Sequence, residues 1–256
     1  MPVVISLLTD FGTRDSYVGE MRGVLLTQAP GAVLADISHD IPPGDIRAGA
    51  YVLGRSWRAF PSGTVHLAVV DPGVGGARAA LALRSEGHYF VGPDNGLFTP
   101  VLGSAHEVVE LASAPAASAT FHGRDLFAPA AAAIAVGTPL DRLGSPPTAP
   151  PTQFPRCEPR REGDAIVGEV VYLDRYGTLV TSLPADTNGD IEIAGITVPL
   201  RRTFSDVGPG KLVAFVGSGG TVEIAVRDGS AATRLSANVG LEVRAPTAES
   251  LKRASR

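Results

Sequence analysis

The sequence predicts two domains of different class, an α/β domain followed by a small all-β barrel. In residues 1–145, short apolar runs rich in β-branched residues alternate with segments of helical periodicity. Residues 146–163 are rich in proline and charge, which is typical of an extended linker. Residues 164–256 contain short apolar runs at close spacing, separated by Gly-rich turns, and this pattern favours a barrel or a sandwich.

In the first domain, the alternation of strands and helices favours a Rossmann-like, mostly parallel sheet with helices on its faces. We expect strands over residues 3–8, 33–37 and 64–70, and a hairpin over 79–83 and 89–91. Helical patterns cover residues 17–25, the segment after Pro42-Pro43 and the Ala-rich segment 126–136.

In the second domain, the expected strands are shorter. They cover residues 165–173, 179–182, 191–193, 212–216 and 221–226. Residues 248–256 are expected to form a frayed polar tail.

Composition excludes several classes of protein. The chain of 256 residues is 44% hydrophobic, which is enough to bury a sizeable core. A net charge of -4 argues against a nucleic-acid partner. The single cysteine, Cys157, rules out an internal disulfide. Met1-Pro2 leads directly into a core-like strand, and no apolar run approaches the roughly 20 residues of a membrane span. We therefore expect a cytoplasmic protein without a membrane partner.

Two short segments carry the candidate chemistry. Asp71 directly follows the apolar run 64–70, and the carboxyl ends of strands in α/β folds open into the crevice where ligands bind. Arg78 follows on the same loop, and His122 lies just before a predicted helix, where taken alone it would be interpreted first as a structural histidine. A carboxylate, a guanidinium and an imidazole brought together could hold and deprotonate a water molecule.

Other polar residues have both a binding and a structural interpretation. Asp10 ends the first strand and could accept hydrogen bonds from a sugar diol or cap the following turn. Asp94 and Asn95 belong to the turn GPDNG and could bind a ligand or serve the turn alone. Asp174, in DRYGT, could bind an ammonium group or cap its turn. The segment GSGG, which contains Ser218, could offer backbone N–H groups to a carboxylate or be an ordinary hairpin loop.

The histidines show no paired metal-ligand spacing such as HExxH, and nothing reads as a phosphate-binding GxxxxGK[ST] loop. We therefore expect no metal, although scattered Asp and His residues could in principle build a site for a hard cation. His39 and His66 are interpreted as structural, and His88 and His106 as surface residues.

Taken together, the motifs resemble one family. They are TDFG at 9–12, DPGVGGAR at 71–78, GPDNG at 92–96, FHGRDLFAP at 121–129, DRYG at 174–177 and GSGGTVEIAV at 217–226. In the same order and with similar spacing, these motifs resemble the S-adenosyl-L-methionine (SAM) hydroxide adenosyltransferases, relatives of the SAM-dependent fluorinase and chlorinase. The resemblance runs from about Pro2 to Val243.

The resemblance implies that water or hydroxide attacks C5′ of the SAM ribose, which gives adenosine and L-methionine. No cofactor is implied, because SAM is the substrate. It also implies a homotrimer whose active sites lie between one subunit's first domain and its neighbour's second domain. The family's water-handling trio corresponds to Asp71, Arg78 and His122, and the halogenating relatives carry tyrosine in place of Asp71. Hydrolysis is therefore favoured over halide transfer.

The resemblance assigns the substrate contacts as well. Asp10 is implied to hold the ribose hydroxyls, Phe204 to pack on the adenine, Asp174 to meet the methionine ammonium and Ser218 its carboxylate. The family usually has asparagines where this chain has Thr178 and Ser182, and the first of them reaches the adenine. Threonine offers one hydroxyl in place of an amide's donor and acceptor.

A sulfonium leaves without the help of an acid, so the chemical difficulty lies with the nucleophile. Arg78 stays protonated and would stabilise developing hydroxide, while His122, held by or acting with Asp71, would take the proton. Two other classes stay open. A metal-dependent phosphohydrolase would use Asp10, Asp71, Asp94 and His122 as ligands, and a non-catalytic protein would bind SAM or adenosine without converting it.

Overall fold

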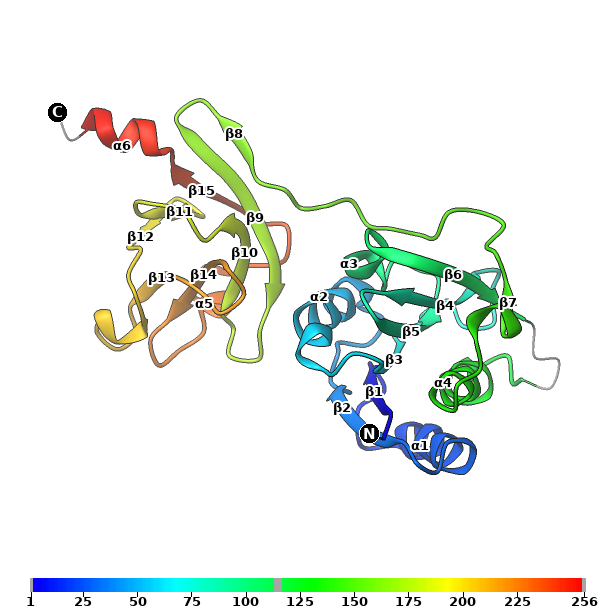
Figure 1. Cartoon of the computed structure of the whole chain (residues 1–256). Helices are drawn as coiled ribbons and strands as arrows, with labels where there is room; N and C mark the ends of the chain where they lie inside the picture. Colours follow the sequence, from blue (N-terminus) through cyan, green and yellow to red (C-terminus); the bar gives the residue numbers. More distant parts are fainter. Residues whose placement is uncertain (1, 113–116, 255–256) are drawn as a thin grey trace. The chain divides into compact units, whose positions relative to one another are not determined.

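The computed structural model describes residues 2–112 and 117–254. The chain divides into two compact units, Met1–Phe154 and Pro155–Arg256 (Figure 1). Each unit has its own hydrophobic core. The first half of the predicted linker is attached to the first unit, since Thr152 N donates to Asp94 Oδ1 at 2.7 Å and Phe154 N donates to Thr99 Oγ1 at 2.9 Å.

The first unit is built on a seven-stranded sheet with the strand order β2-β1-β3-β5-β4-β6-β7. The strands are β1 (Val4–Thr9), β2 (Val33–Ser38), β3 (Val65–Val69), β4 (Ala80–Ser85), β5 (His88–Pro93), β6 (Ala105–Leu111) and β7 (Gly144–Ser145). β3 is buried along its whole length, as expected of a central strand with both faces covered.

The sheet is mixed. Strands β2, β1, β3 and β5 pair in parallel, whereas β4 pairs antiparallel with both β5 and β6 and β6 pairs antiparallel with β7. The expected mostly parallel sheet therefore describes only one half. The other half is antiparallel because the tight turn at Glu86-Gly87 folds β4 back onto β5 as a hairpin, and such a turn cannot connect parallel strands.

Helices cover both faces of this sheet (Figure 1). They are α1 (Tyr17–Gln28), α2 (Ile46–Ser56), α3 (Thr99–Leu102) and α4 (Ala128–Ala135), with short 3₁₀ turns at Trp57–Ala59 and Leu140–Arg142. α1 packs against α4, and α2 packs against α3. The helix predicted after Pro42-Pro43 begins as expected, because Asp45 Oδ1 accepts a hydrogen bond from Ala48 N at 2.9 Å. The Ala-rich helix is preceded by a π-helical turn, η2 (Gly123–Phe127).

The second unit is a nearly closed, antiparallel barrel-like sheet with the order β12-β11-β15-β9-β10-β14-β13, and β8 pairs with β9. The strands are β8 (Arg160–Glu162), β9 (Ala165–Leu173), β10 (Leu179–Pro184), β11 (Ile191–Ile193), β12 (Ile196–Val198), β13 (Leu212–Val216), β14 (Thr221–Val226) and β15 (Glu242–Pro246). Residues after β12 bridge to β13 through Ala214, which brings the two ends of the sheet together. A 3₁₀ turn, η4 (Phe204–Asp206), and the short helix α5 (Ala231–Leu235) complete the unit.

Two sequence-based expectations are wrong. Residues 248–254 form helix α6 (Ala248–Ala254) rather than a frayed tail, because Thr247 Oγ1 accepts from Ser250 N at 3.2 Å at its start and Arg253 pairs with Asp164. His88 is buried, at 6% exposure, because β5 lies between β3 and β4 in the sheet. The side chain of His106 lies outside the described part of the chain.

Among the described residues, no helix is both long enough and apolar enough to cross a membrane.

Candidate functional site

The structure brings the three candidate catalytic residues into contact. Arg78 Nε lies 3.1 Å from both carboxylate oxygens of Asp71, and Arg78 Nη2 donates to Asp71 Oδ2 as well. The same Nη2 lies 2.9 Å from His122 Nδ1. The Asp71 side chain is only 4% exposed and that of Arg78 12% exposed, so the ion pair is largely removed from water. The guanidinium carbon also lies 5.2 Å from the centre of the Phe127 ring.

A close backbone approach brings the Asp71 loop toward His122. Gly75 has a φ of 76°, and a Cβ built on it would fall 2.3 Å from the carbonyl oxygen of Ala119. Only glycine lets the loop 71–78 lie this close to the segment that precedes His122. Phe121 O then accepts from both Arg124 N and Asp125 N, which starts the π-helical turn η2 directly after His122. Such turns occur frequently at functional sites.

The contact with Arg78 fixes the proton positions on His122. A guanidinium has only donors, so Nδ1 of His122 must accept. In the neutral imidazole the proton therefore resides on Nε2, and this nitrogen is a hydrogen-bond donor.

Asp10 lies at the same edge of the sheet. It follows β1, which neighbours β3, and Asp10 Oδ2 accepts from Gly44 N at 2.7 Å. A Cβ on Gly44 would lie 3.6 Å from Pro72, the residue after Asp71. The loops that carry Asp10 and Asp71 are thus neighbours, as the switch-point argument predicts.

An aromatic cluster joins the Asp10 loop to the His122 segment. The rings of Phe11 and Phe121 are 6.0 Å apart, and that of Tyr17 is 5.8 Å from Phe11 and 5.3 Å from Phe121. Sequence reasoning did not single out these rings. Phe11 directly follows Asp10 and Phe121 directly precedes His122. This position next to a polar candidate residue is the signal that could have identified them.

Asp94 and Asn95 serve the fold of the first unit. Asp94 Oδ1 accepts from Thr152 N, and Asn95 Nδ2 donates to Val70 O at 2.8 Å while its Oδ1 accepts from Leu97 N at 3.3 Å. Asn95 therefore holds the main chain directly before Asp71. A substrate contact for either residue stays a prediction.

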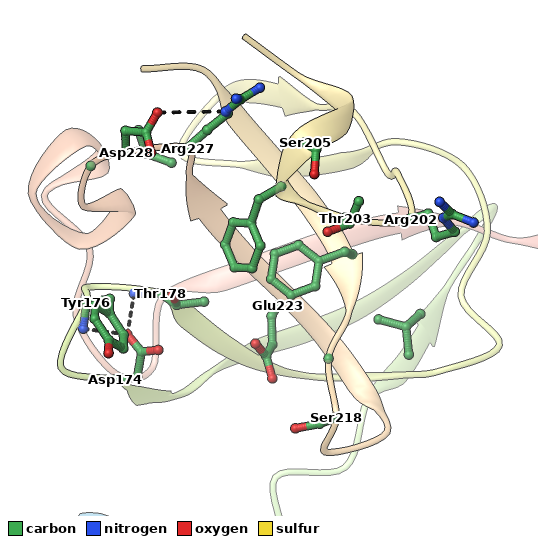
Figure 2. A pocket seen from close by; sticks show the side chains of 16 residues that line it. Asp174, Tyr176, Thr178, Arg202, Thr203, Ser205, Ser218, Glu223, Arg227 and Asp228 are labelled. Carbon is green, nitrogen blue, oxygen red and sulfur yellow. Dashed lines mark hydrogen bonds and ion pairs between the residues drawn. The ribbon is translucent and has the colours of Figure 1, made fainter. Parts of the chain in front are cut away.

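The second unit contains a pocket of about 690 Å³, and the four candidate residues of this unit all lie in its lining: Asp174, Thr178, Phe204 and Ser218 (Figure 2). Phe204 is 43% exposed and packs on Phe215 with 4.5 Å between the ring centres. An exposed ring in a pocket is suited to a flat, aromatic ligand group. Thr178 is 6% exposed, so it presents only a small surface to the pocket.

The Asp174 turn is held by its own carboxylate. Asp174 Oδ1 accepts from Tyr176 N at 2.9 Å and from Thr178 N at 2.7 Å. Asp174 therefore caps its own turn, which is the structural role that the sequence allows for it. The carboxylate has a second oxygen for a ligand, so the two roles are compatible.

Sequence reasoning missed other residues of the pocket. Tyr176, Arg202, Phe215, Glu223, Arg227 and Asp228 line it as well. The lining therefore carries charges of both signs, which suits a zwitterionic ligand. Glu223 lies close to the Ser218 loop, since a Cβ on Gly217 would fall 1.9 Å from Glu223 Oε1. Alternation along β14 places Glu223 on the face opposite the buried Val222 and Ile224.

Ser182, which stands in place of the second family asparagine, holds two strands together. Its Oγ accepts from Glu169 N at 3.0 Å. Within residues 2–112 and 117–254, no group of three or more His, Cys, Asp or Glu side chains is arranged to hold a metal ion.

The first unit carries a carboxylate–guanidinium–imidazole cluster, and the second carries a pocket lined by aromatic and charged side chains. These features define a class of two-domain proteins equipped to bind a small polar ligand. Comparison with known proteins identifies the family. Residues 5–144 match the SAM hydroxide adenosyltransferase N-terminal domain and residues 168–244 match its C-terminal domain. The chain belongs to the SAM hydroxide adenosyltransferase family.

Individual relatives agree with this assignment. A protein of Thermus thermophilus named (R)-S-adenosyl-L-methionine hydrolase is 42% identical, over 94% of this chain and 98% of the relative. A fluorinase of an Actinoplanes species is 28% identical, over 87% of this chain and 90% of its own length. A crystal structure of a conserved protein from Thermotoga maritima, 33% identical, superposes with a TM-score of 0.87 over 95% of this chain and all of the other.

Proposed function

We propose that this protein hydrolyses SAM to adenosine and L-methionine. The observation that carries the proposal is the contact cluster of Asp71, Arg78 and His122. Membership of the SAM hydroxide adenosyltransferase family and 42% identity to a named hydrolase support it. In the reaction, the water oxygen forms a bond to C5′ while the C5′–sulfur bond breaks. The methionine sulfur keeps the electron pair, and the water loses a proton.

The hydrogen bonds of the cluster suggest how the roles are divided. His122 directs its accepting nitrogen to Arg78, which leaves Nε2–H to orient a water molecule as a donor. We therefore propose that Asp71 accepts the proton of the attacking water. The sequence alone favours His122 for this role. A carboxylate is sufficient, because the attacking water gains positive charge as the O–C5′ bond forms and its proton becomes acidic. Arg78 donates to both oxygens of Asp71 and so holds the carboxylate that accepts the proton in place.

The substrate-binding roles follow the same reasoning. Asp10 holds the ribose hydroxyls, Phe204 packs on the adenine, Asp174 meets the ammonium and Ser218 the carboxylate, and the hydroxyl of Thr178 faces the adenine. The exposed Phe204 ring and the mixed charges of the pocket support these assignments. We propose further that no cofactor takes part and that the active protein is a cytoplasmic homotrimer with active sites at subunit interfaces.

The configuration of the substrate's sulfur is part of the proposal. A sulfonium centre is pyramidal and exists as two epimers, and the Thermus thermophilus relative is named for the (R) form. We propose the same preference here. In-line attack requires the departing sulfur to lie opposite the water, so an epimer that directs its methyl group differently fits the site less well.

The test is to incubate the protein with each SAM epimer in chloride buffer containing EDTA and to separate the nucleosides by chromatography. We expect adenosine and methionine in equal amounts, formed faster from the (R) epimer. The Asp71→Asn variant should lose about a hundredfold or more in turnover, whereas Asp141→Asn, which changes an exposed carboxylate of the same unit, should not. A requirement for metal would favour a phosphohydrolase, 5′-chloro-5′-deoxyadenosine would favour halide transfer, and bound but unconverted SAM would favour a binding protein.

A further inference from the structure

A chain of polar contacts runs from helix α1 to the TDFG loop, residues 9–12, and the proposed mechanism does not use it. Arg22 donates to Asp36 Oδ2, and Asp36 Oδ1 lies 3.1 Å from His39 Nε2. His39 Nδ1 lies 2.8 Å from Thr9 Oγ1, which in turn accepts from Phe11 N at 3.3 Å. Thr9 is 0% exposed and His39 5% exposed, so the inner part of the chain is sealed from water.

The donors and acceptors in this chain have one consistent direction. Although partial burial acts to raise the pKa of Asp36, its close contacts with the Arg22 guanidinium and the His39 ring outweigh this and hold the pKa below its ordinary value. The ionised carboxylate can only accept, so His39 Nε2 carries the proton and Nδ1 accepts from the Thr9 hydroxyl. The oxygen of Thr9 is then oriented to accept from Phe11 N.

The composition Thr-His-Asp is that of a nucleophilic triad, but the arrangement serves a different purpose. A hydroxyl that is 0% exposed has no access to a substrate. What the hydroxyl reaches instead is the main chain of the loop, two residues further on.

His39 holds this loop from both sides. Its side chain acts through Thr9 on Phe11 N, and its carbonyl oxygen accepts from Gly12 N at 2.8 Å. Asp10 lies between these two attachments, and its own Oδ2 accepts from Gly44 N. The position of the Asp10 carboxylate is thus set by His39 on one side and by the Gly44 loop on the other.

We propose that His39, acting through Thr9 and oriented by Asp36, is a positioning residue that fixes the TDFG loop so that Asp10 meets the substrate. This inference rests on the proposed function, because it takes Asp10 to contact the substrate. The expected consequence of breaking the chain is poorer substrate binding with little change in the chemical step, since Asp71, Arg78 and His122 lie on other loops.

The sharpest variant is Thr9→Val, which removes the hydroxyl and keeps the shape. The same strand supplies a matched control, because Ser6 is also 0% exposed and its Oγ lies 2.7 Å from His66 Nδ1, but this pair leads to His88 and not to the loop. Ser6→Ala therefore removes a similar buried hydroxyl–imidazole contact. Asp36→Asn changes a partly exposed residue and tests the outer end of this series of polar contacts.

Steady-state kinetics with SAM, thermal melting and amide hydrogen exchange should be measured for all variants. We expect Thr9→Val to raise KM about fivefold to tenfold, with kcat within twofold, and to speed exchange at Phe11 N. Asp36→Asn should shift KM in the same direction, Thr9→Ser should restore it, and Ser6→Ala should lower the melting temperature without moving KM.

Unchanged KM in both Thr9→Val and Asp36→Asn would overturn the inference, as would an equal rise of KM in Ser6→Ala. A wild-type protein that yields no adenosine would refute the proposed function and the inference with it. An active wild type with unaffected variants would refute the inference alone.

Discussion

Arg78 connects Asp71 to His122 in the candidate cluster. One side of its guanidinium faces both oxygens of Asp71, and its Nη2 also faces His122 Nδ1. Three directed contacts from one side chain require the planar, forked arrangement of N–H groups that only arginine has. The ion pair is also largely buried, so leaving either charge without the other would be costly.

Arg78→Lys should therefore impair turnover although it keeps the positive charge. A lysine ammonium is a compact charge on a flexible stem and cannot reach both Asp71 and His122 in fixed directions. We expect kcat/KM for SAM to fall at least tenfold, which corresponds to about 1.4 kcal/mol. The matched control is Arg84→Lys on β4, because the guanidinium carbon of Arg84 lies 5.7 Å from the centre of the Tyr89 ring and away from the candidate cluster. Equal activity of the two variants would show that charge alone is needed at position 78.

The turn after β9 positions two of the second unit's candidate residues, Asp174 and Thr178. Gly177 has a φ of 78°, and a Cβ built on it would fall 2.0 Å from Ser230 Oγ at the start of α5. Gly177 O also accepts from Ala232 N, so the turn is attached to this helix. The pocket side of the turn carries Asp174 and Thr178.

Gly177→Ala should weaken SAM binding through this turn. The variant combines a left-handed backbone, which costs roughly 1 kcal/mol for alanine, with a steric overlap that moves Ser230 or the turn. We expect KM to rise several-fold and the melting temperature to fall by a few degrees. Gly195→Ala, also at positive φ but with open space around its Cβ, is the control for backbone strain alone. A KM that rises equally in both variants would contradict the role of the Asp174 turn.

Much of the element order could be predicted from the sequence. The buried strands β1 and β3 and the β4–β5 hairpin are apolar runs bounded by turn residues, and Asp45 marks the start of α2. β6, β12, β15 and α5 were not predicted. β15 buries only Val243 and Ala245, and α5 has five residues, which is too short for helical periodicity to be visible.

The site was predictable in its residues but not in its contacts. Strand ends placed Asp10 and Asp71 at one edge, because β1 and β3 are neighbours. The approach of Gly75 to Ala119, which brings the Asp71 loop toward His122, joins segments far apart in the sequence. The same holds for Thr9 and His39, whose pairing depends on the register of β1 and β2. A sequence pattern describes which side chains face inward, but not which of them meet.

The two units differ in how they respond to acid. All five histidines of the chain lie in residues 1–154. His66 is 1% exposed and contacts Ser6 and His88 through its two ring nitrogens. Burial, with the charge of His88 as a second cause, lowers the pKa of His66 to about 3, and burial also lowers the pKa of His88.

Acid should therefore unfold the first unit before the second. Between the ordinary pKa of 6.5 and the folded-state value of about 3, the unfolded chain binds a proton at His66 that the folded chain excludes. This group therefore stabilises the unit most above pH 6.5. As the pH is lowered from 7 to 4, the free energy of unfolding decreases by roughly 3 kcal/mol from this group alone. Trp57, the single tryptophan, is buried with its ring 5.1 Å from that of His88, so its fluorescence reports on this unit.

Urea unfolding followed by Trp57 fluorescence at several pH values, with circular dichroism as the signal for the whole chain, measures this difference. We expect the fluorescence midpoint to fall steeply below pH 6 while a second transition, visible only by circular dichroism, moves less. His66→Gln cannot take up the proton and should flatten the pH dependence whatever its stability at pH 7. An equally steep dependence in this variant would mean that other groups, His88 among them, control the acid response of the first unit.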